Sequence, residues 1–134
     1  MPPFPVEDAL DLIVTLQQSP ESACAYIGTD AAEIRTDLEE LDQPWTDTAR
    51  LRTAADGSVT GIALIEWDQE TGRSWVHGPW TTPETWERDA ATLLAEVIDQ
   101  APVHKHEIYA DIAHTRMAAL AEDAGWRRSE ANYE

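Results

Sequence analysis

The sequence predicts an α/β domain in which a mixed, mostly antiparallel and twisted sheet carries helices on both faces. Helical patterns come first, and strand-like runs separated by turn residues follow them. A helix, a strand, a second helix and a final strand-like run complete the order, which is typical of a parallel crossover added to an antiparallel meander. The 134 residues fit a single domain, residues 1–134.

The first helix is expected over residues 6–18, where apolar residues recur on one side at helical spacing. Gln17 is the one polar residue on that side, and Ser19-Pro20 ends the helix. Residues 21–27 are expected to form another helical piece, which Gly28 closes.

A clearer helix is expected to begin at Asp30, because Asp30 and Glu33 form a capping-box pattern. Gln43-Pro44 ends it. Its apolar positions follow at helical spacing: Ile34, Leu38 and Leu41.

Strands are expected around residues 51–53 and over residues 59–67 and 73–80, which are rich in β-branched and aromatic side chains. Asp56-Gly57 is a strong hairpin signal between the first two, and a second turn falls at residues 70–72. Gly78-Pro79 lies inside the third strand. Since proline cannot donate to a ladder, strand pairing is expected to break or bulge there.

The next helix is expected over residues 83–100, with Thr82 as its hydroxyl cap and Pro83 at its first position. A strand over residues 107–112 and a helix over residues 114–124 follow, with Gly125 as a left-handed stop. Residues from Trp126 onward are expected to form a final strand.

The charge of the chain restricts its partners. The formal net charge is -17, from 26 acidic against 9 basic residues. Such a field repels phosphate backbones and anionic membranes, so neither nucleic acid nor membrane is expected as a partner. Two roles of this charge stay open: attraction of a cationic small molecule such as an amine, and simple maintenance of solubility.

The cysteine and histidine residues restrict which disulfides and metal sites the chain can form. The single cysteine excludes a disulfide framework and a cysteine-based zinc site. His104 and His106 flank a lysine, but no third ligand accompanies them, so no metal is expected.

No apolar run approaches the roughly 18 residues of a membrane span, and the first residues lack a signal-peptide pattern, so a cytoplasmic location is expected.

Two stretches resemble the GNAT acetyltransferase superfamily. Leu120-Ala-Glu-Asp-Ala-Gly125-Trp126 is similar to the Leu-Tyr-x-x-x-Gly-Phe ending of that family's helix after the fifth strand. Residues 73–94 look like its fourth strand, pyrophosphate loop and following helix. The resemblance covers roughly residue 49 to the end. It implies that acetyl-CoA binds where the fourth and fifth strands separate, next to a bulge placed here at Gly78-Pro79.

The resemblance also implies an acetyl-CoA site, although this sequence departs from the family pattern at several of its positions. The residues carried over as contacts for acetyl-CoA are Trp80, Thr81, Thr85, Arg88 and Ala90. Of the loop positions, Ala90 alone fits the family pattern, and Arg88 stands where a glycine would let the backbone approach phosphate. An Arg88 guanidinium clamping phosphate and a solvent-facing Arg88 both remain open. Ala121 replaces the tyrosine that often protonates the leaving thiolate.

Glu66 and His77 are the candidate catalytic bases for an amine substrate, with strand N–H groups polarising the thioester carbonyl. The alternatives are an exposed strand end for Glu66 and a histidine satisfied on a sheet face for His77. His114 lies near the family's asparagine position.

Two functions follow from the resemblance. One is an acyl-CoA-dependent N-acetyltransferase, or a domain of one, that transfers acetyl to an amine. The other is a non-catalytic, degenerate GNAT domain that acts as a structural or binding module. Because the chain ends before the family's seventh strand, we expect either a second GNAT domain, in the layout of mycothiol synthase-like proteins, or a homodimer through the C-terminal sheet edge.

Overall fold

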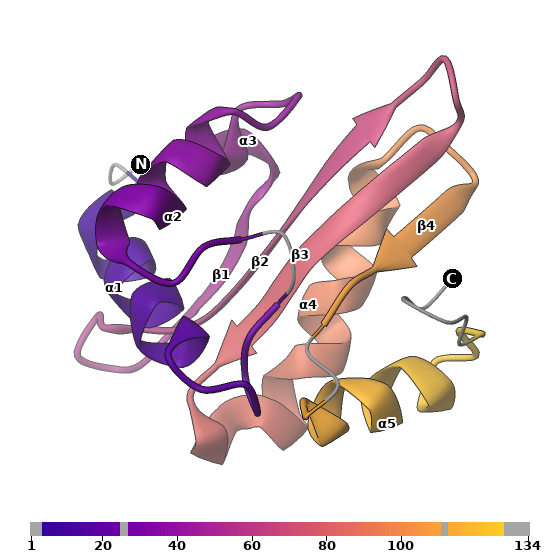
Figure 1. Cartoon of the computed structure of the whole chain (residues 1–134). Coiled ribbons are helices and arrows are strands. Elements are labelled where there is room, and N and C mark those ends of the chain that lie inside the picture. Colours follow the sequence, from indigo (N-terminus) through magenta and orange to yellow (C-terminus); the bar gives the residue numbers. More distant parts are fainter. Residues whose placement is uncertain (1–3, 25–26, 111–112, 128–134) are drawn as a thin grey trace.

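The computed structural model describes residues 4–24, 27–110 and 113–127 (Figure 1). Helices come first, three strands follow, and a helix, a strand and a helix complete the described chain. The helical elements are α1 (Val6–Gln17), α2 (Ala31–Glu39), α3 (Trp45–Thr48), the 3₁₀ turn η1 (Pro83–Thr85), α4 (Trp86–Gln100) and α5 (Thr115–Asp123). The strands are β1 (Arg50–Thr53), β2 (Val59–Asp68), β3 (Arg73–Thr81) and β4 (Lys105–Ile108).

The four strands form one sheet in the order β1-β2-β3-β4. The pairs β1–β2 and β2–β3 are antiparallel, whereas β3 and β4 are parallel because α4 crosses over between them. The prediction of an α/β domain with a mixed, mostly antiparallel sheet is confirmed.

Helices cover both faces of the sheet, as predicted (Figure 1). On one face, α1, α2 and α3 pack on Ile62, Leu64 and Trp80. On the other face, α4 and α5 pack on side chains that alternate with these, including Ala63 and Ile65. Alternate residues of β2 therefore enter two separate cores, which explains its nearly continuous apolar sequence.

The expected irregularity at Gly78-Pro79 is present. Trp80 pairs with Ile62 and His77 pairs with Leu64, so β3 holds one residue more than β2 across this interval. The Gly78-Pro79 peptide bond is cis, and Gly78 has φ 94°. A Cβ on Gly78 would lie 3.0 Å from the Trp80 ring and 3.1 Å from the Ile62 carbonyl oxygen, so glycine suits this position.

The helix predicted over residues 21–27 is wrong for the residues that are described there. Glu21 and Ser22 form a turn, and Cys24 forms an isolated antiparallel bridge with Ala110. The segment is too short to be a stable helix without a partner, and the Gln17 side chain binds its backbone groups instead.

Three smaller differences concern element ends. The short helix α3 was not predicted, and the first turn of the helix expected from Pro83 is the 3₁₀ turn η1. The strand expected over residues 107–112 is β4, which begins two residues earlier, at Lys105, and ends at Ile108. Residues 111–112 and most of the expected final strand lie outside the described residues, and Trp126 and Arg127 are not in a strand.

Candidate functional site

The pairing of β3 with β4 stops before the bulge at Gly78-Pro79, and we call the interval between the two chains beyond this point the notch. The parallel pairing joins Arg73–Val76 to Lys105–Ile108 and stops there. Beyond this point Ala110 pairs with Cys24, a residue of the segment that follows α1. Figure 1 shows this segment running beside β3 toward the chain that leaves β4. The notch therefore contains a part of the chain itself.

Cys24 joins both sides of the notch. Its backbone pairs with Ala110 on the β4 side, and its sulfur accepts a backbone hydrogen bond from Gly78 on β3. The side chain is buried, and burial raises the pKa of the thiol to about 12, although the Gly78 hydrogen bond acts in the opposite direction. Near neutral pH the thiol is protonated, so it is a packing group rather than a nucleophile.

Gln17, at the end of α1, holds this segment in place. Its Nε2 donates to the carbonyl oxygens of Cys24 at 3.1 Å, Ile27 at 3.0 Å and Gly28 at 3.1 Å. Its Oε1 accepts from the Cys24 N–H at 2.7 Å and from the Trp80 indole N–H at 2.9 Å. The sequence pattern alone predicts no role for Gln17, although a polar residue on an apolar helix side is a signal that points to a buried hydrogen-bonding group.

The two predicted catalytic residues, Glu66 and His77, lie in contact. His77 Nε2 is 2.7 Å from Glu66 Oε2, and the side chains are 8% and 17% exposed. His77 pairs with Leu64, two residues before Glu66 on β2, so both side chains point to the sheet face that α1 covers. The pair has two available roles, as a proton acceptor or as a structural hydrogen bond within the domain. His77 is adjacent to Gly78 of the bulge.

A second acidic residue, Glu107, lies on the other side of β3 from Glu66. In the strand register Trp75 lies opposite Glu66 on one side and Glu107 on the other. Glu107 is 1% exposed. Its carboxylate binds Arg73 and accepts from the Tyr109 hydroxyl at 2.8 Å. This carboxylate is therefore paired, as a buried charge requires.

The residues predicted to contact acetyl-CoA are distributed over both faces of the sheet. Trp80 is buried in the core that faces α1, whereas Ala90 is buried in the core that faces α4. Thr81 and Thr85 are buried, and the Thr85 hydroxyl is 2.8 Å from that of Thr82. The structure does not gather these side chains around one point.

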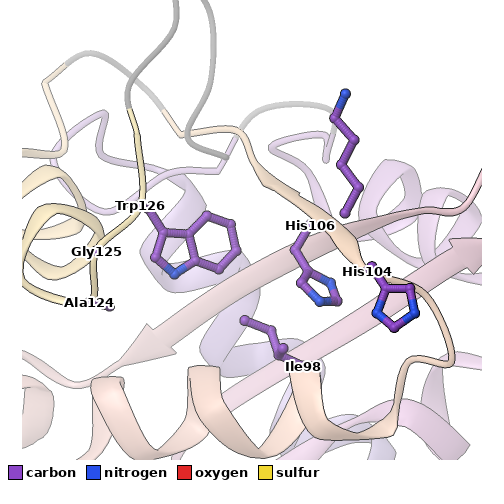
Figure 2. Close-up of a pocket in the computed structure, with 7 residues that line it drawn as sticks. Ile98, His104, His106, Ala124, Gly125 and Trp126 are labelled. Atoms are coloured by element: carbon purple, nitrogen blue, oxygen red, sulfur yellow. The ribbon is translucent and has the colours of Figure 1, made fainter.

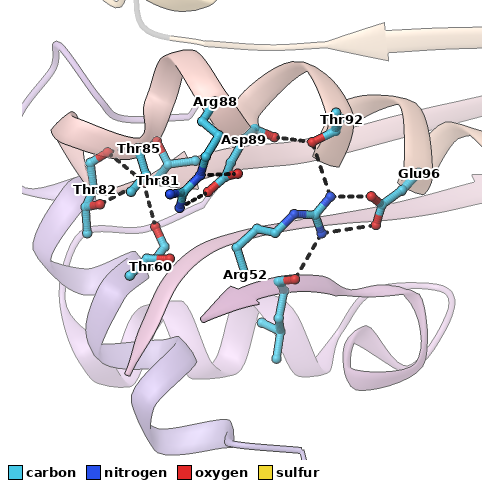
Figure 3. Close-up of polar contacts among 10 residues, drawn as sticks. Arg52, Thr60, Thr81, Thr82, Thr85, Arg88, Asp89, Thr92 and Glu96 are labelled. Atoms are coloured by element: carbon cyan, nitrogen blue, oxygen red, sulfur yellow. Dashed lines mark hydrogen bonds and ion pairs between the residues drawn. The ribbon is translucent and has the colours of Figure 1, made fainter. Parts of the chain in front are cut away.

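Arg88 pairs with its own neighbour at the start of α4 (Figure 3). Its Nε and Nη2 donate to the two Asp89 oxygens, both at 3.0 Å. The Arg88 hydrogen bonds lower the pKa of Asp89 despite its burial, and the charge of Arg52 acts in the same direction. Arg52 in turn binds Glu96 and the Thr92 hydroxyl. The Arg88 side chain is 69% exposed and already carries a carboxylate partner.

A separate hollow of about 330 Å³ lies at the β4 edge, between β4 and the ends of α4 and α5 (Figure 2). Its side walls include Ile98, His104, His106 and Trp126. His106 Nδ1 is 2.6 Å from the Ser74 hydroxyl, and burial, with a smaller contribution from His104, lowers the pKa of His106. Across the described residues, no three His, Cys, Asp or Glu side chains are arranged to hold a metal ion.

Comparisons with known proteins assign the chain to no family. A scan against protein-family models, a search of curated proteins and a search of solved structures each found no match. In the ranges 4–24, 27–110 and 113–127, no helix has the length and apolar character to cross a membrane. The structure thus defines the class of the protein as an α/β domain with a four-stranded mixed sheet, and the GNAT resemblance stays a prediction from the sequence.

Proposed function

We propose that this chain is a GNAT-like domain that does not transfer acetyl groups and that acts as a structural or binding module. The observation that carries the proposal is the position of Cys24 in the notch between β3 and β4. In the family that the sequence resembles, this notch is where acetyl-CoA binds. Here the chain fills the same place with its own backbone.

The hydrogen bonds at the notch support this proposal. An acetyltransferase needs a free strand N–H beside the bulge to polarise the thioester carbonyl, and the Gly78 N–H donates to the Cys24 sulfur. Removing the segment would break the four Gln17 bonds to the backbone of Cys24, Ile27 and Gly28. Because the Gln17 amide has two N–H groups for its three carbonyl contacts, these count as about three full bonds; at about 1 kcal/mol net for each, the cost is roughly 3 kcal/mol, or at least about a hundredfold loss of ligand affinity.

The charges at the start of α4 support it as well. Pro83 contributes no N–H, and Glu84 and Glu87 are exposed beside the place where a pyrophosphate would lie. Arg88 pairs with Asp89 and is not held ready for a phosphate. With a net charge of -17, the chain would attract a polyanion such as CoA only through a locally positive site.

A second candidate function is acetyl-CoA-dependent N-acetylation of an amine, and the Glu66–His77 contact favours it. The pair would accept a proton from the substrate ammonium, and the amine nitrogen would then attack the thioester carbonyl. The N–C bond forms as the C–S bond breaks, and CoA leaves as the thiolate or takes up the proton. Because Ala121 replaces the family tyrosine, no phenol supplies that proton.

Calorimetric titration of the purified chain with acetyl-CoA at moderate salt separates the two candidates. The module proposal expects no saturable heat up to about 1 mM ligand, where a Kd above this range corresponds to less than about 4 kcal/mol of binding free energy. Saturable micromolar binding that Arg88→Glu weakens would contradict it. An amine screen that follows CoA release would then test Glu66→Gln and His77→Gln against the wild type.

The proposed module also has an expected partner, either a second GNAT domain or a second copy of the chain at the C-terminal edge of the sheet. The strand β4 is the last in the sheet order, so this edge would carry the contact. Light scattering on the isolated chain measures its mass directly. A well-behaved monomer over a wide concentration range would contradict an obligate homodimer.

A further inference from the structure

The hollow at the β4 edge differs in charge from the rest of the molecule. Its titratable residues are His104, Lys105 and His106, and no Asp or Glu is among the described residues that line it. Three other hollows of the described chain are each lined by at least one carboxylate. In a chain with 26 acidic and 9 basic residues, a hollow without acids is a local exception that suits an anion.

The position of the His106 ring leaves one of its nitrogens available. Ser74 and His106 are paired in the β3–β4 register, and the Ser74 hydroxyl is 2.6 Å from His106 Nδ1. Because Ser74 is buried, this contact fixes the ring from the side of the sheet. The other ring nitrogen, Nε2, is therefore the one that can meet a ligand.

An apolar and an aromatic side chain complete the hollow (Figure 2). Ile98 comes from α4, and Trp126 follows the end of α5. The His106 and Trp126 rings have their centroids 6.5 Å apart. Ile98 and Trp126 are both half-buried, so each keeps apolar surface uncovered. Such a surface suits the face of a flat ring.

We propose that this hollow is a binding site for a small aromatic carboxylate, whose ring packs on Trp126 and Ile98 and whose carboxylate accepts a hydrogen bond from His106 Nε2. The hollow has a volume of about 330 Å³, near the lower limit of ligand pockets, which suits a ligand of one ring. A single negative charge also suits a chain of net charge -17, which would repel a polyanion.

This inference goes beyond the proposed function, because the hollow and the notch lie at opposite ends of β4. Lys105 and His106, at the hollow, are the first residues of β4, whereas the notch lies beyond its last residue, Ile108. Binding at the hollow is therefore independent of whether the notch accepts acetyl-CoA.

Binding of a carboxylate should be linked to protonation of His106. In the free protein, burial lowers the pKa of His106, and His104 acts in the same direction to a smaller degree. A carboxylate beside Nε2 would favour the imidazolium and would raise this pKa. The complex then takes up a proton, so the affinity should rise as the pH falls toward the pKa of the free protein.

The surroundings of His106 contain no carboxylate that would take the place of the ligand. The sheet contributes the Ser74 hydroxyl and Lys105, and the described residues that line the hollow from α4 and from the end of α5 have no titratable side chains. Asp99 and Asp123, the acids next to those residues, are exposed and do not line the hollow.

The first experiment is calorimetric titration of the wild-type chain with benzoate. Benzoate stays ionised at about pH 6 and at about pH 7.5. We expect saturable binding at about pH 6 with a Kd of about 1 mM or tighter, at least about fivefold tighter than at about pH 7.5. Absence of saturable heat up to about 10 mM benzoate, where about 3 kcal/mol of binding would be detected, would overturn the proposal.

Two matched ligands separate the charge from the ring. Benzamide keeps the ring but has no charge, and we expect it to bind at least about fivefold more weakly at about pH 6 and without the pH dependence. Cyclohexanecarboxylate keeps the charge but has no aromatic face, and we expect at least about threefold weaker binding. Equal affinity for benzamide would overturn the anion assignment, and equal affinity for cyclohexanecarboxylate would overturn the aromatic one.

The second experiment identifies the residue that takes up the proton. The His106→Gln variant still offers a hydrogen-bonding group to Ser74 but has no imidazolium, so its benzoate affinity should not depend on pH in this range. The matched control is His104→Gln in the same hollow, which should keep the pH dependence. Loss of the dependence in His104→Gln, with its retention in His106→Gln, would contradict the assignment.

A third measurement on the wild-type chain does not depend on how these variants fold. The imidazole proton signals in NMR spectra give the pKa of His106 with and without saturating benzoate. We expect benzoate to raise this pKa by at least about 0.7, the counterpart of a fivefold change in affinity. An unchanged His106 pKa would overturn the proposed contact.

Discussion

The Trp80 indole N–H donates to Gln17 Oε1 at 2.9 Å across 63 residues of sequence. Trp80 lies on β3 just beyond the bulge, and Gln17 is the last residue of α1. The bond therefore fixes the end of the first helix against β3, next to its bulge. Since the same oxygen also accepts from the Cys24 N–H, the bond orients the amide that binds the backbone after α1.

The first prediction concerns this bond. Trp80→Phe keeps an aromatic ring in the core but removes the N–H donor, so Gln17 Oε1 loses one of its two donors. We expect a loss of about 2 kcal/mol in the free energy of unfolding, from the hydrogen bond and from the smaller ring. Urea denaturation measures it. The control is Trp75→Phe at a half-buried ring on the same strand, and an equal loss there would contradict the special role of Trp80.

Much of the fold could be predicted because local signals agree with the tertiary structure. The Asp56-Gly57 and Gly72 turns, the α4 apolar stripe and the Gly125 stop all depend on side chains within one or two turns of chain. The segment containing Cys24 could not be predicted, since its backbone binds the Gln17 side chain and pairs with Ala110, which lies far along the chain. Its apolar composition, taken alone, suited a helix as well as a bridge.

The candidate site could likewise be predicted from the sequence only in part. The types and positions of Glu66 and His77 suggested each residue separately, but their contact depends on the β2–β3 register across the bulge. The Arg88 bond to Asp89 joins adjacent residues, and yet helix spacing rules give no reason to expect it. Gln17 was visible as an exception on an apolar face, but its partners were not.

The second prediction separates the hydrogen bond of the Glu66–His77 pair from its charge. Glu66→Gln keeps an acceptor at the same reach, so we expect less than about 1 kcal/mol of lost stability. Glu66→Ala leaves a buried His77 nitrogen without this partner, and we expect a loss of about 1–3 kcal/mol. Thermal or urea unfolding of both variants measures the difference. Equal losses for Gln and Ala would show that the contact contributes nothing as a hydrogen bond.

The third prediction tests the capping box of α2. Asp30 Oδ1 accepts from the Glu33 N–H at 2.9 Å, and Glu33 Oε1 accepts from the Thr29 N–H at 3.2 Å. Asp30→Ala should cost about 1 kcal/mol of stability. Removing any acid also relieves repulsion in a chain of net charge -17, so the matched control is Asp42→Ala on the exposed chain after α2. Equal midpoints for the two variants would argue against the cap.

The fourth prediction is a pH dependence that His106 produces. Burial, and to a smaller degree His104, lowers the pKa of His106 from its ordinary value of 6.5. As the pH falls through about 6.5, the unfolded chain takes up a proton at this position while the folded chain still resists it. The free energy of unfolding should therefore fall from about pH 7 downward and level off below the folded pKa, apart from later carboxylate effects. The variant His106→Gln still offers a hydrogen-bonding group to Ser74 and should flatten the curve in this range.

The carboxylates act in a different window, which makes the histidine contribution measurable. Hydrogen bonds from Arg88 and Arg52 lower the pKa values of Asp89 and Glu96 below their ordinary values of 3.8 and 4.5. Their stabilising effect is complete above those values and is lost only as the pH falls toward the folded pKa. Urea titrations of the wild type and His106→Gln between pH 5 and 8 thus isolate His106. If the two curves stay parallel through this range, the hollow at the β4 edge does not disfavour the imidazolium.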